Sequence, residues 1–289
     1  MILLAICYTL LANQADYDGK TLLLTGQFQI SHSMGRLSAE KATIQNLQLR
    51  NPTKKGTQIY LEEGVAIDVP EGKTPFSLKA KRAFCELLPQ TPFSFFQFQT
   101  LHFFDQVEIS TSQNLIARGG SASYKLGTLT LFPSLPTTTC HLLRGADQID
   151  AHEIRFDLPH ETLICDHPKG KLQQEALQFS ANQLIWHREG KFLLEGNVEL
   201  ISTRLQDKES FVLADSVTYQ PSDETLIFGS IAPKKVLFWQ EGLNLSATEV
   251  KVRRDPLNEK EIIEGIGDVH FAFDVEEKNS IEKFLSNYL

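Results

Sequence analysis

Hydrophobic and polar positions recur along the chain around a short motif centred on an alanine. Eight copies, with anchors 27 to 41 residues apart, can be aligned on Ala12, Ala39, Ala80, Ala117, Ala151, Ala181, Ala214 and Ala247. Apolar or small residues stand two before the anchor and three and five after it, and the two residues directly after it are polar or glycine. Self-similarity at such an interval predicts a repeat architecture.

The spacing inside each copy predicts a strand that bends once. In a regular strand the buried positions alternate with period two. Here they fall two before the anchor and at it, then three and five after it, so the parity changes across the polar pair. One extra residue is what a β-bulge or a sharp bend inserts. A bend at the same place in every copy would crease the whole sheet along one line.

A second kind of strand, with clean alternation, lies between the anchors. Examples run from 22 to 30 and from 192 to 200, each with a glycine at its centre, whereas Glu63 and Asp105 hold the glycine position in other copies. Glycine inside a strand marks a bend or a close backbone approach. Turn residues such as Glu189-Gly190 join the two kinds. Each repeat is therefore a hairpin, which predicts about sixteen antiparallel strands.

These features predict an all-β protein, organised as one elongated β-repeat domain over residues 1–289. The crease gives the antiparallel stack a V-shaped or flattened-barrel cross-section. Residues 276–289 have the apolar spacing of a short helix, which would cap one end. A stack of this kind has open edge strands, so we expect self-association or a partner at the end near 20–30 or 260–273.

Composition and charge narrow the function. The chain of 289 residues has a net charge of −8 and no cluster of Lys or Arg beyond doublets such as Lys54-Lys55. Nucleic-acid binding needs a basic footprint, so it is excluded as a function. A phosphate-binding loop, a dinucleotide-binding glycine motif and a zinc-protease motif are all missing from the sequence, and we expect no enzymatic activity and no cofactor.

The N-terminus and the cysteines leave the compartment open. Residues 1–12 resemble the apolar part of a signal peptide, but no Lys or Arg precedes them. They are either the remainder of a longer leader, which could tether the protein to a membrane, or the first strand. Cys7, Cys85, Cys140 and Cys165 form no metal-binding spacing, and one or two disulfides are possible.

The alternation of the two strand types resembles the OstA-like lipopolysaccharide-transport family, which includes LptA, LptC and the periplasmic part of LptD. The family alternates strands of the form A-x-x-A/V-x-Y with strands of the form L-x-G-x-V. Here Ala12-Asn13-Gln14-Ala15-Asp16-Tyr17 precedes Leu24-Thr25-Gly26-Gln27-Phe28, and Leu194-Glu195-Gly196-Asn197-Val198 precedes Ala214-Asp215-Ser216-Val217-Thr218-Tyr219. The similarity is good over 10–45 and 177–273, whereas 76–176 departs from it in spacing, prolines and missing glycines.

The resemblance implies a β-taco or β-jellyroll fold and a periplasmic location in outer-membrane biogenesis. It also implies non-enzymatic binding of lipopolysaccharide, or a similar amphiphile, through its acyl chains, and partners among other OstA-like proteins through edge-strand pairing. The residues expected to line the lipid groove are inward-facing and apolar or aromatic: Tyr17, Phe28, Phe156, Trp186, Val198, Tyr219 and Val269. No metal site is expected.

Three other groups of residues have a functional and a structural interpretation. Six phenylalanines, Phe93, Phe95, Phe96, Phe98, Phe103 and Phe104, either form an exposed apolar patch or belong to a strand buried on both sides. His152, His160, Cys165 and His167 include zinc-ligand types, but scattered structural residues are the favoured interpretation. Gly119-Gly120-Ser121-Ala122-Ser123 misses the G-x-S-x-G nucleophile motif and lies in a strand repeat.

Two functions therefore remain in competition. The first is a lipid-holding module of lipopolysaccharide export, and the second is a structural or adhesive β-repeat protein that binds partners through strand edges without lipid. A hydrolase is a distant third. A continuous apolar cavity would favour the first function, and an interior filled by side chains would favour the second.

Overall fold

The computed structural model describes residues 9–32, 35–46, 57–69, 75–87, 98–112, 114–125, 127–173, 176–202, 209–254 and 261–272. Regular structure in this part of the chain consists entirely of β-strands, and every described pairing is antiparallel. The predicted all-β antiparallel fold is thus confirmed. The helix predicted over 276–289 lies outside the described residues.

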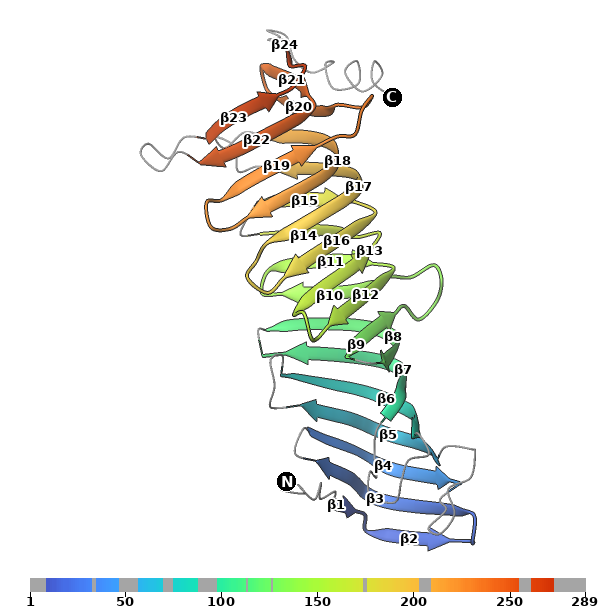
Figure 1. Cartoon of the computed structure of the whole chain (residues 1–289). Helices are drawn as coiled ribbons and strands as arrows, with labels where there is room; N and C mark the ends of the chain where they lie inside the picture. The colour runs from blue at the N-terminus through green and yellow to red at the C-terminus, as the bar shows by residue number, and fades with distance from the viewer. Residues whose placement is uncertain are drawn as a thin grey trace, which may run out of the picture. The chain divides into compact units, whose positions relative to one another are not determined.

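The chain divides into two compact units, and each unit is made of two separate ranges of the sequence. The first unit comprises 1–145 and 152–161, and the second comprises 146–151 and 162–289. Each unit is a stack of antiparallel strands (Figure 1). The single elongated domain expected over 1–289 stays a prediction.

The strands of the first unit occupy most of the N-terminal half of the chain. They are β1 (Thr9–Leu11), β2 (Gln14–Tyr17), β3 (Thr21–His32), β4 (Gly35–Gln45), β5 (Thr57–Val69), β6 (Phe76–Leu87), β7 (Phe98–Thr111), β8 (Leu115–Lys125), β9 (Thr128–Phe132), β10 (Cys140–Arg144) and β12 (Glu153–Asp157). Strands β3 to β8 are long and pair in sequence order.

The second unit contains the remaining strands. They are β11 (Asp147–Ala151), β13 (Thr162–Asp166), β14 (Lys169–Leu172), β15 (Leu177–Ser180), β16 (Gln183–His187), β17 (Phe192–Ser202), β18 (Ser210–Gln220), β19 (Thr225–Gly229), β20 (Val236–Gln240), β21 (Leu243–Ala247), β22 (Glu249–Arg254), β23 (Glu261–Ile266) and β24 (His270–Ala272). The described residues thus form 24 strands, where the sequence predicted about sixteen. Several predicted strands are divided in two at their bend.

The bend predicted after each anchor alanine is present. In β17 the ladder to β18 shifts register between Glu195 and Val198, opposite the polar pair Asp215-Ser216. In the neighbouring repeat the polar residue Asn182 lies between β15 and β16 and thus interrupts the strand. Equivalent register shifts occur along β3, β4, β5, β6 and β7. The parity change in the sequence is therefore confirmed as a line of bulges and breaks, which we call the crease.

Two consecutive residues with positive φ form the crease in the second strand type. These pairs are Gly26-Gln27, Glu63-Gly64, Asp105-Gln106, Gly196-Asn197 and Gly267-Asp268, with φ between 47° and 75°. Left-handed backbone is costly for most residues and is tolerated by glycine. This conformation explains the recurrent glycine, and it also shows that Glu63 and Asp105 adopt the same geometry without one.

The crease divides each unit into two half-sheets that share the long strands. In the second unit one half-sheet contains β11, β14, β15, β20, β21 and β24, and the other contains β13, β16, β19, β22 and β23. Strands β17 and β18 continue through the crease into both. In both units the inward side chains of the half-sheets form the core.

Candidate functional site

The inward surface of the repeats is the candidate site, and its periodicity is as predicted. All four inward positions of a copy are buried in six of the eight copies, those anchored on Ala39, Ala80, Ala151, Ala181, Ala214 and Ala247. The polar pairs lie at the crease between these positions. Each half-sheet therefore presents an apolar face to the interior of its unit.

The second unit places an aromatic row on one half-sheet. Trp186 pairs with Phe192, and Phe192 pairs with Tyr219, so the three side chains lie side by side on adjacent strands. The rings of Phe192 and Tyr219 stack with their centroids 5.1 Å apart. Trp186 and Tyr219 were both predicted as groove residues, and their exposed fractions are only 5% and 7%. Stacked, buried rings of this kind contribute strongly to packing.

Three more of the predicted groove residues are buried on the inward face. Val198 lies directly after the crease of β17 and is 1% exposed. In the first unit Phe28 faces Ala39 on β4 and is fully buried, and Phe156 pairs with Leu129 on β9 and is 7% exposed. Phe28 and Phe156 belong to the inward surface of the first unit, and Trp186, Val198 and Tyr219 belong to that of the second.

Tyr17 and Val269 depart from the expected burial. Tyr17, on β2, is 53% exposed, and Val269, just before β24, is 37% exposed. Both lie in a terminal repeat, where the neighbouring strand that covers an inward side chain elsewhere in the stack is missing from the described residues. The alternation in the sequence predicted that these side chains point inward. It could not predict their burial, which also requires a neighbouring strand to cover them.

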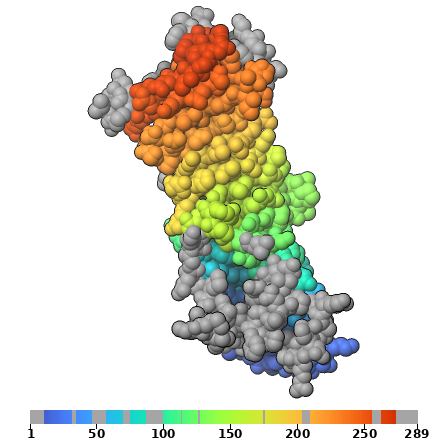
Figure 2. Space-filling model, viewed as in Figure 1, coloured from blue at the N-terminus to red at the C-terminus, as the bar shows by residue number. Residues whose placement is uncertain are grey.

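Side chains fill the interior of both units. Phe28, Phe192, Phe228 and Phe238 are each at most 1% exposed. A water-filled groove would leave such residues accessible, so their inward surfaces are closed in this state. On the face drawn in Figure 2 the side chains of the second unit form a continuous surface.

Two aspartates, Asp147 and Asp215, have local structural roles. Asp147 is 3% exposed and accepts a hydrogen bond of 2.8 Å from the backbone N–H of Gln173. Asp215, at the crease of β18, accepts one of 2.8 Å from the N–H of Ile231 and one of 3.2 Å from Lys234 Nζ. The bond from Ile231 lowers the pKa of Asp215, and Lys234 lowers it further. These contacts fasten loops to strands.

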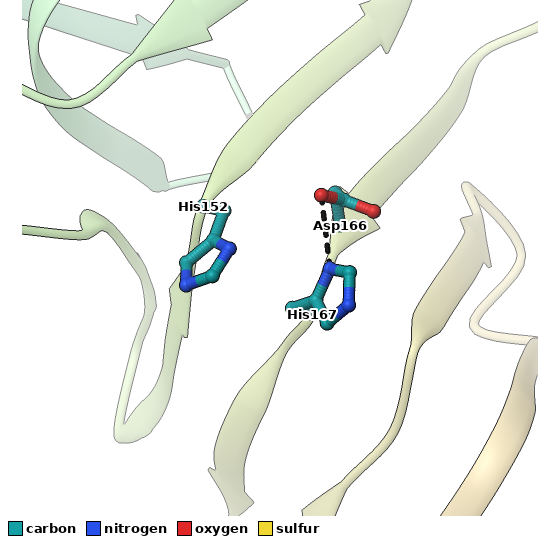
Figure 3. Close-up of side chains that lie close together, drawn as sticks. All are labelled: His152, Asp166 and His167. Atoms are coloured by element: carbon teal, nitrogen blue, oxygen red, sulfur yellow. Dashed lines mark hydrogen bonds and ion pairs between the residues drawn. The ribbon is translucent and has the colours of Figure 1, made fainter. Parts of the chain in front are cut away.

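The zinc-ligand candidates considered from the sequence have different surroundings. Cys165 is fully buried in the core of the second unit, where it packs as an apolar residue. His167 lies on the surface, with Nδ1 3.0 Å from the Asp166 carboxylate (Figure 3). His160, in the first unit, is 2.9 Å from the Asp157 carboxylate. Each of these two histidines thus has a nearby carboxylate within its own turn.

The remaining sequence candidates also have structural positions. Phe103 is buried and Phe104 is 39% exposed, so alternation places them on opposite faces of β7, while Phe93, Phe95 and Phe96 lie outside the described residues. Cys85, Cys140 and Cys165 form no disulfide. Burial raises the pKa of Cys140 to about 12 and raises that of Cys85 further, which keeps both thiols protonated.

One feature was missed by sequence reasoning. A hollow of about 600 Å³ lies on the outer surface of the first unit, where it is bordered by Lys79, Glu108, Arg118 and His141. These residues come from four strands and lie far apart in sequence. Only the strand register aligns them, so no local motif could have revealed the site.

Comparisons with known proteins give no family. No family model matches the chain, and no curated protein matches it. Among solved structures, the chain is similar to Hsv2 of Kluyveromyces marxianus (9% identity, TM-score 0.16, 89% of this chain and 97% of that one) and to Hsv2p of Kluyveromyces lactis (8%, 0.17, 92% and 98%). Scores this low carry no information on the fold. In the described part of the chain no helix has the length and hydropathy to span a membrane.

Proposed function

We propose that this chain is a non-enzymatic lipid-binding protein of the OstA-like type, which holds the acyl chains of lipopolysaccharide or a similar amphiphile between its two half-sheets. In this proposal the creased stack is a V-shaped β-taco or β-jellyroll in the periplasm, and it serves export to the outer membrane. One observation carries the proposal: inward positions are apolar in copy after copy and are buried together on a sheet creased along one line.

Acyl chains match the chemistry of this inward face. Burial of hydrocarbon is favourable by about 0.8 kcal/mol per methylene group and needs no directional contact. Phe28, Phe156, Trp186, Val198 and Tyr219 offer such burial without charge. Because side chains fill the interior, the acyl chains enter by separating the half-sheets and replacing contacts between them. The exposed Tyr17 and Val269 contact the cargo where it passes a terminal repeat.

The terminal repeats supply the partner surfaces of the proposal. Strand β2 pairs only with β3 in the described structure, and β24 pairs only with β21. Large apolar residues are exposed beside these strands, namely Leu11 and Tyr17 at one end and Ile266, Val269 and Phe271 at the other. Another OstA-like protein, or a second copy, would pair with such an edge and cover these residues.

Site-specific photo-crosslinking tests the cargo. A photoreactive amino acid is placed at Trp186, which faces inward, and in a matched control at His187, which follows it on the opposite face of β16. After incubation with lipopolysaccharide, irradiation should attach lipid from position 186 and not from 187. Attachment from neither position, in a protein that remains folded, would contradict the proposal.

The second candidate is a structural or adhesive β-repeat protein that binds partners through its strand edges and carries no lipid. The nearly complete burial of Phe28, Phe228 and Phe238 favours it, since a closed interior needs no cargo for its stability. The same crosslinking experiment bears on both: a protein that remains folded and attaches no lipid from position 186 would favour the second candidate.

A further inference from the structure

The hollow on the outer surface of the first unit is formed where the chain crosses the crease between β9 and β10. The crossing segment, 133–139, leaves the sheet and runs beside the crease of β8. A space of about 600 Å³ remains between this segment and the outer face of β6, β7 and β8. Its lining includes Lys79, Glu108, Arg118, Ser134, Thr139 and His141.

The crossing segment is held in place by close packing and by local hydrogen bonds. A methyl group at Gly120 would lie 2.6 Å from the backbone nitrogen of Ser134, and one at Gly119 would lie 2.7 Å from the carbonyl oxygen of Phe132. Only glycine at both positions allows the segment to approach β8 so closely. The Thr138 hydroxyl accepts a bond of 3.1 Å from the N–H of Leu135 and donates one of 2.9 Å to its carbonyl. The wall of the hollow is therefore formed before any ligand binds.

Strand register places charged side chains along one edge of the hollow. Lys79 pairs with Glu108, Glu108 with Arg118, and Arg118 with His141, so the four lie in one row across β6, β7, β8 and β10. Arg118 Nε donates a bond of 2.8 Å to Glu108, and in the described structure Lys79 has no ion-pair partner. Lys79 and Arg118 thus place two cations beside the single carboxylate of Glu108. The row is thus positive on a chain whose net charge is −8.

Hydroxyl groups from the crossing segment complete the lining. Ser134 and Thr139 face the same space as the basic row. Guanidinium, ammonium and hydroxyl donors together are the usual partners of a phosphate group, and bonds from charged donors are the stronger ones. The volume exceeds that of a phosphate, so the hollow has room for a larger group that carries one, such as a sugar phosphate.

We propose that this hollow binds a phosphate-bearing ligand of sugar-phosphate type, with Lys79 and Arg118 as the principal contacts. His141, Ser134 and Thr139 supply further hydrogen bonds to it. The ligand is either a free sugar phosphate or the phosphorylated headgroup of a lipid, because both present the same chemistry. This inference is independent of the lipid function proposed above, since the hollow lies on the outer face and not between the half-sheets.

Calorimetric titration of the full chain with glucose 1-phosphate, and with inorganic phosphate, tests the site. The parent protein should bind glucose 1-phosphate, and Lys79→Gln and Arg118→Gln should each weaken binding by about tenfold, as expected for the loss of one charge-assisted bond. Lys81→Gln is the matched control, because Lys81 is an exposed lysine on the same strand that does not line the hollow. It should bind within about twofold of the parent, by the same reasoning.

A second arm distinguishes the two sources of the phosphate. Vesicles of phosphatidylcholine with and without phosphatidic acid are sedimented with each variant. Binding to the phosphatidic acid vesicles that is lost in Lys79→Gln and kept in Lys81→Gln identifies a lipid headgroup, and binding of glucose 1-phosphate alone identifies a free ligand. If the parent binds neither probe, or if the lining variants bind as the parent does, the inference is wrong. Thermal melting confirms that each variant is folded.

Discussion

The crease leads to a sharp prediction for Gly196→Ala. Gly196 has φ +75°, and its carbonyl oxygen accepts a hydrogen bond of 2.8 Å from the N–H of Asn182, the residue that follows an anchor alanine. The same bond recurs from Asn13 to Gly26 and from Thr248 to Gly267, each at 2.9 Å. We therefore expect Gly196→Ala to destabilise the crease and not only one strand.

The magnitude has two parts. An alanine in left-handed backbone costs about 1–2 kcal/mol relative to its preferred conformation. Its methyl group would also lie 2.5 Å from Asn182 Nδ2 and 3.0 Å from Asn182 Cβ and Cγ, so the Asn182 side chain must move. The smaller entropy of the unfolded alanine chain offsets about 0.4–1 kcal/mol. The expected loss in the free energy of unfolding is about 2 kcal/mol.

Urea denaturation followed by circular dichroism measures this loss, and Gly190→Ala provides the matched control. Gly190 also has positive φ, +91°, but a methyl group there would meet only Pro221, at 3.8 Å. The control therefore carries the backbone cost without the clash, and we expect a loss of about 1 kcal/mol or less. Equal losses at both sites would show that close packing at the crease contributes nothing, and the reasoning would be refuted.

The converse substitution tests the same rule at a copy in which the first residue of the crease pair is not glycine. Glu63 holds the equivalent position with φ +63°, and its side chain is exposed. Glu63→Gly should relieve the left-handed strain and raise the urea midpoint. The free energy of unfolding should increase by about 0.5–1 kcal/mol after the greater entropy of unfolded glycine is subtracted. A fall in the midpoint would mean that the crease does not strain this residue.

Other substitutions test the core, the loops and the thiols. Trp186→Asp buries a charge at a 5% exposed position and should cost about 3–5 kcal/mol, whereas Tyr17→Asp at a 53% exposed position should leave the thermal midpoint nearly unchanged. Asp215→Ala should cost about 1–2 kcal/mol in urea. Because the pKa of Asp215 is lowered in the folded state, its contribution is present above the ordinary carboxyl range and lost as the pH falls through that lowered pKa. Folding raises the pKa of Cys140 to about 12, so its contribution should fall as the pH rises above the ordinary thiol value of 9.0, and the thiol should react with a thiol reagent only after unfolding.

Sequence periodicity predicted the antiparallel strands and the burial of most inward side chains. Ala181 and Trp186 are both buried, on either side of the polar Asn182, as the change of parity required. Burial was predictable because in a repeat stack each inward residue meets the equivalent residue of the next copy. At Tyr17 the same rule fails, since a terminal strand has a neighbour on one side only in the described structure.

Two features could not be predicted, for different physical reasons. Residue propensity does not predict the positive φ of Glu63, because the pairing of the strands imposes it on a residue that disfavours it. The basic row of Lys79, Arg118 and His141 depends on three pairings among four strands, and register is set by the complete sheet. Filling of the interior likewise depends on how closely the half-sheets approach each other, and the alternation along one strand does not determine that distance.

The packed interior changes which residues would control lipid affinity under the proposed function. When acyl chains separate the half-sheets, side chains such as Phe192 and Tyr219 exchange apolar contacts with protein for apolar contacts with lipid. Their apolar surface stays out of water, so the hydrophobic free energy changes little. The cost that remains is deformation of the strands that continue through both half-sheets, and this deformation is concentrated at the crease. Glycine in left-handed backbone, as at Gly196, makes such a hinge easier to open than Glu63 or Asp105 does. Affinity would therefore be governed by the residues of the crease, and the aromatic row would mainly keep the interior dry.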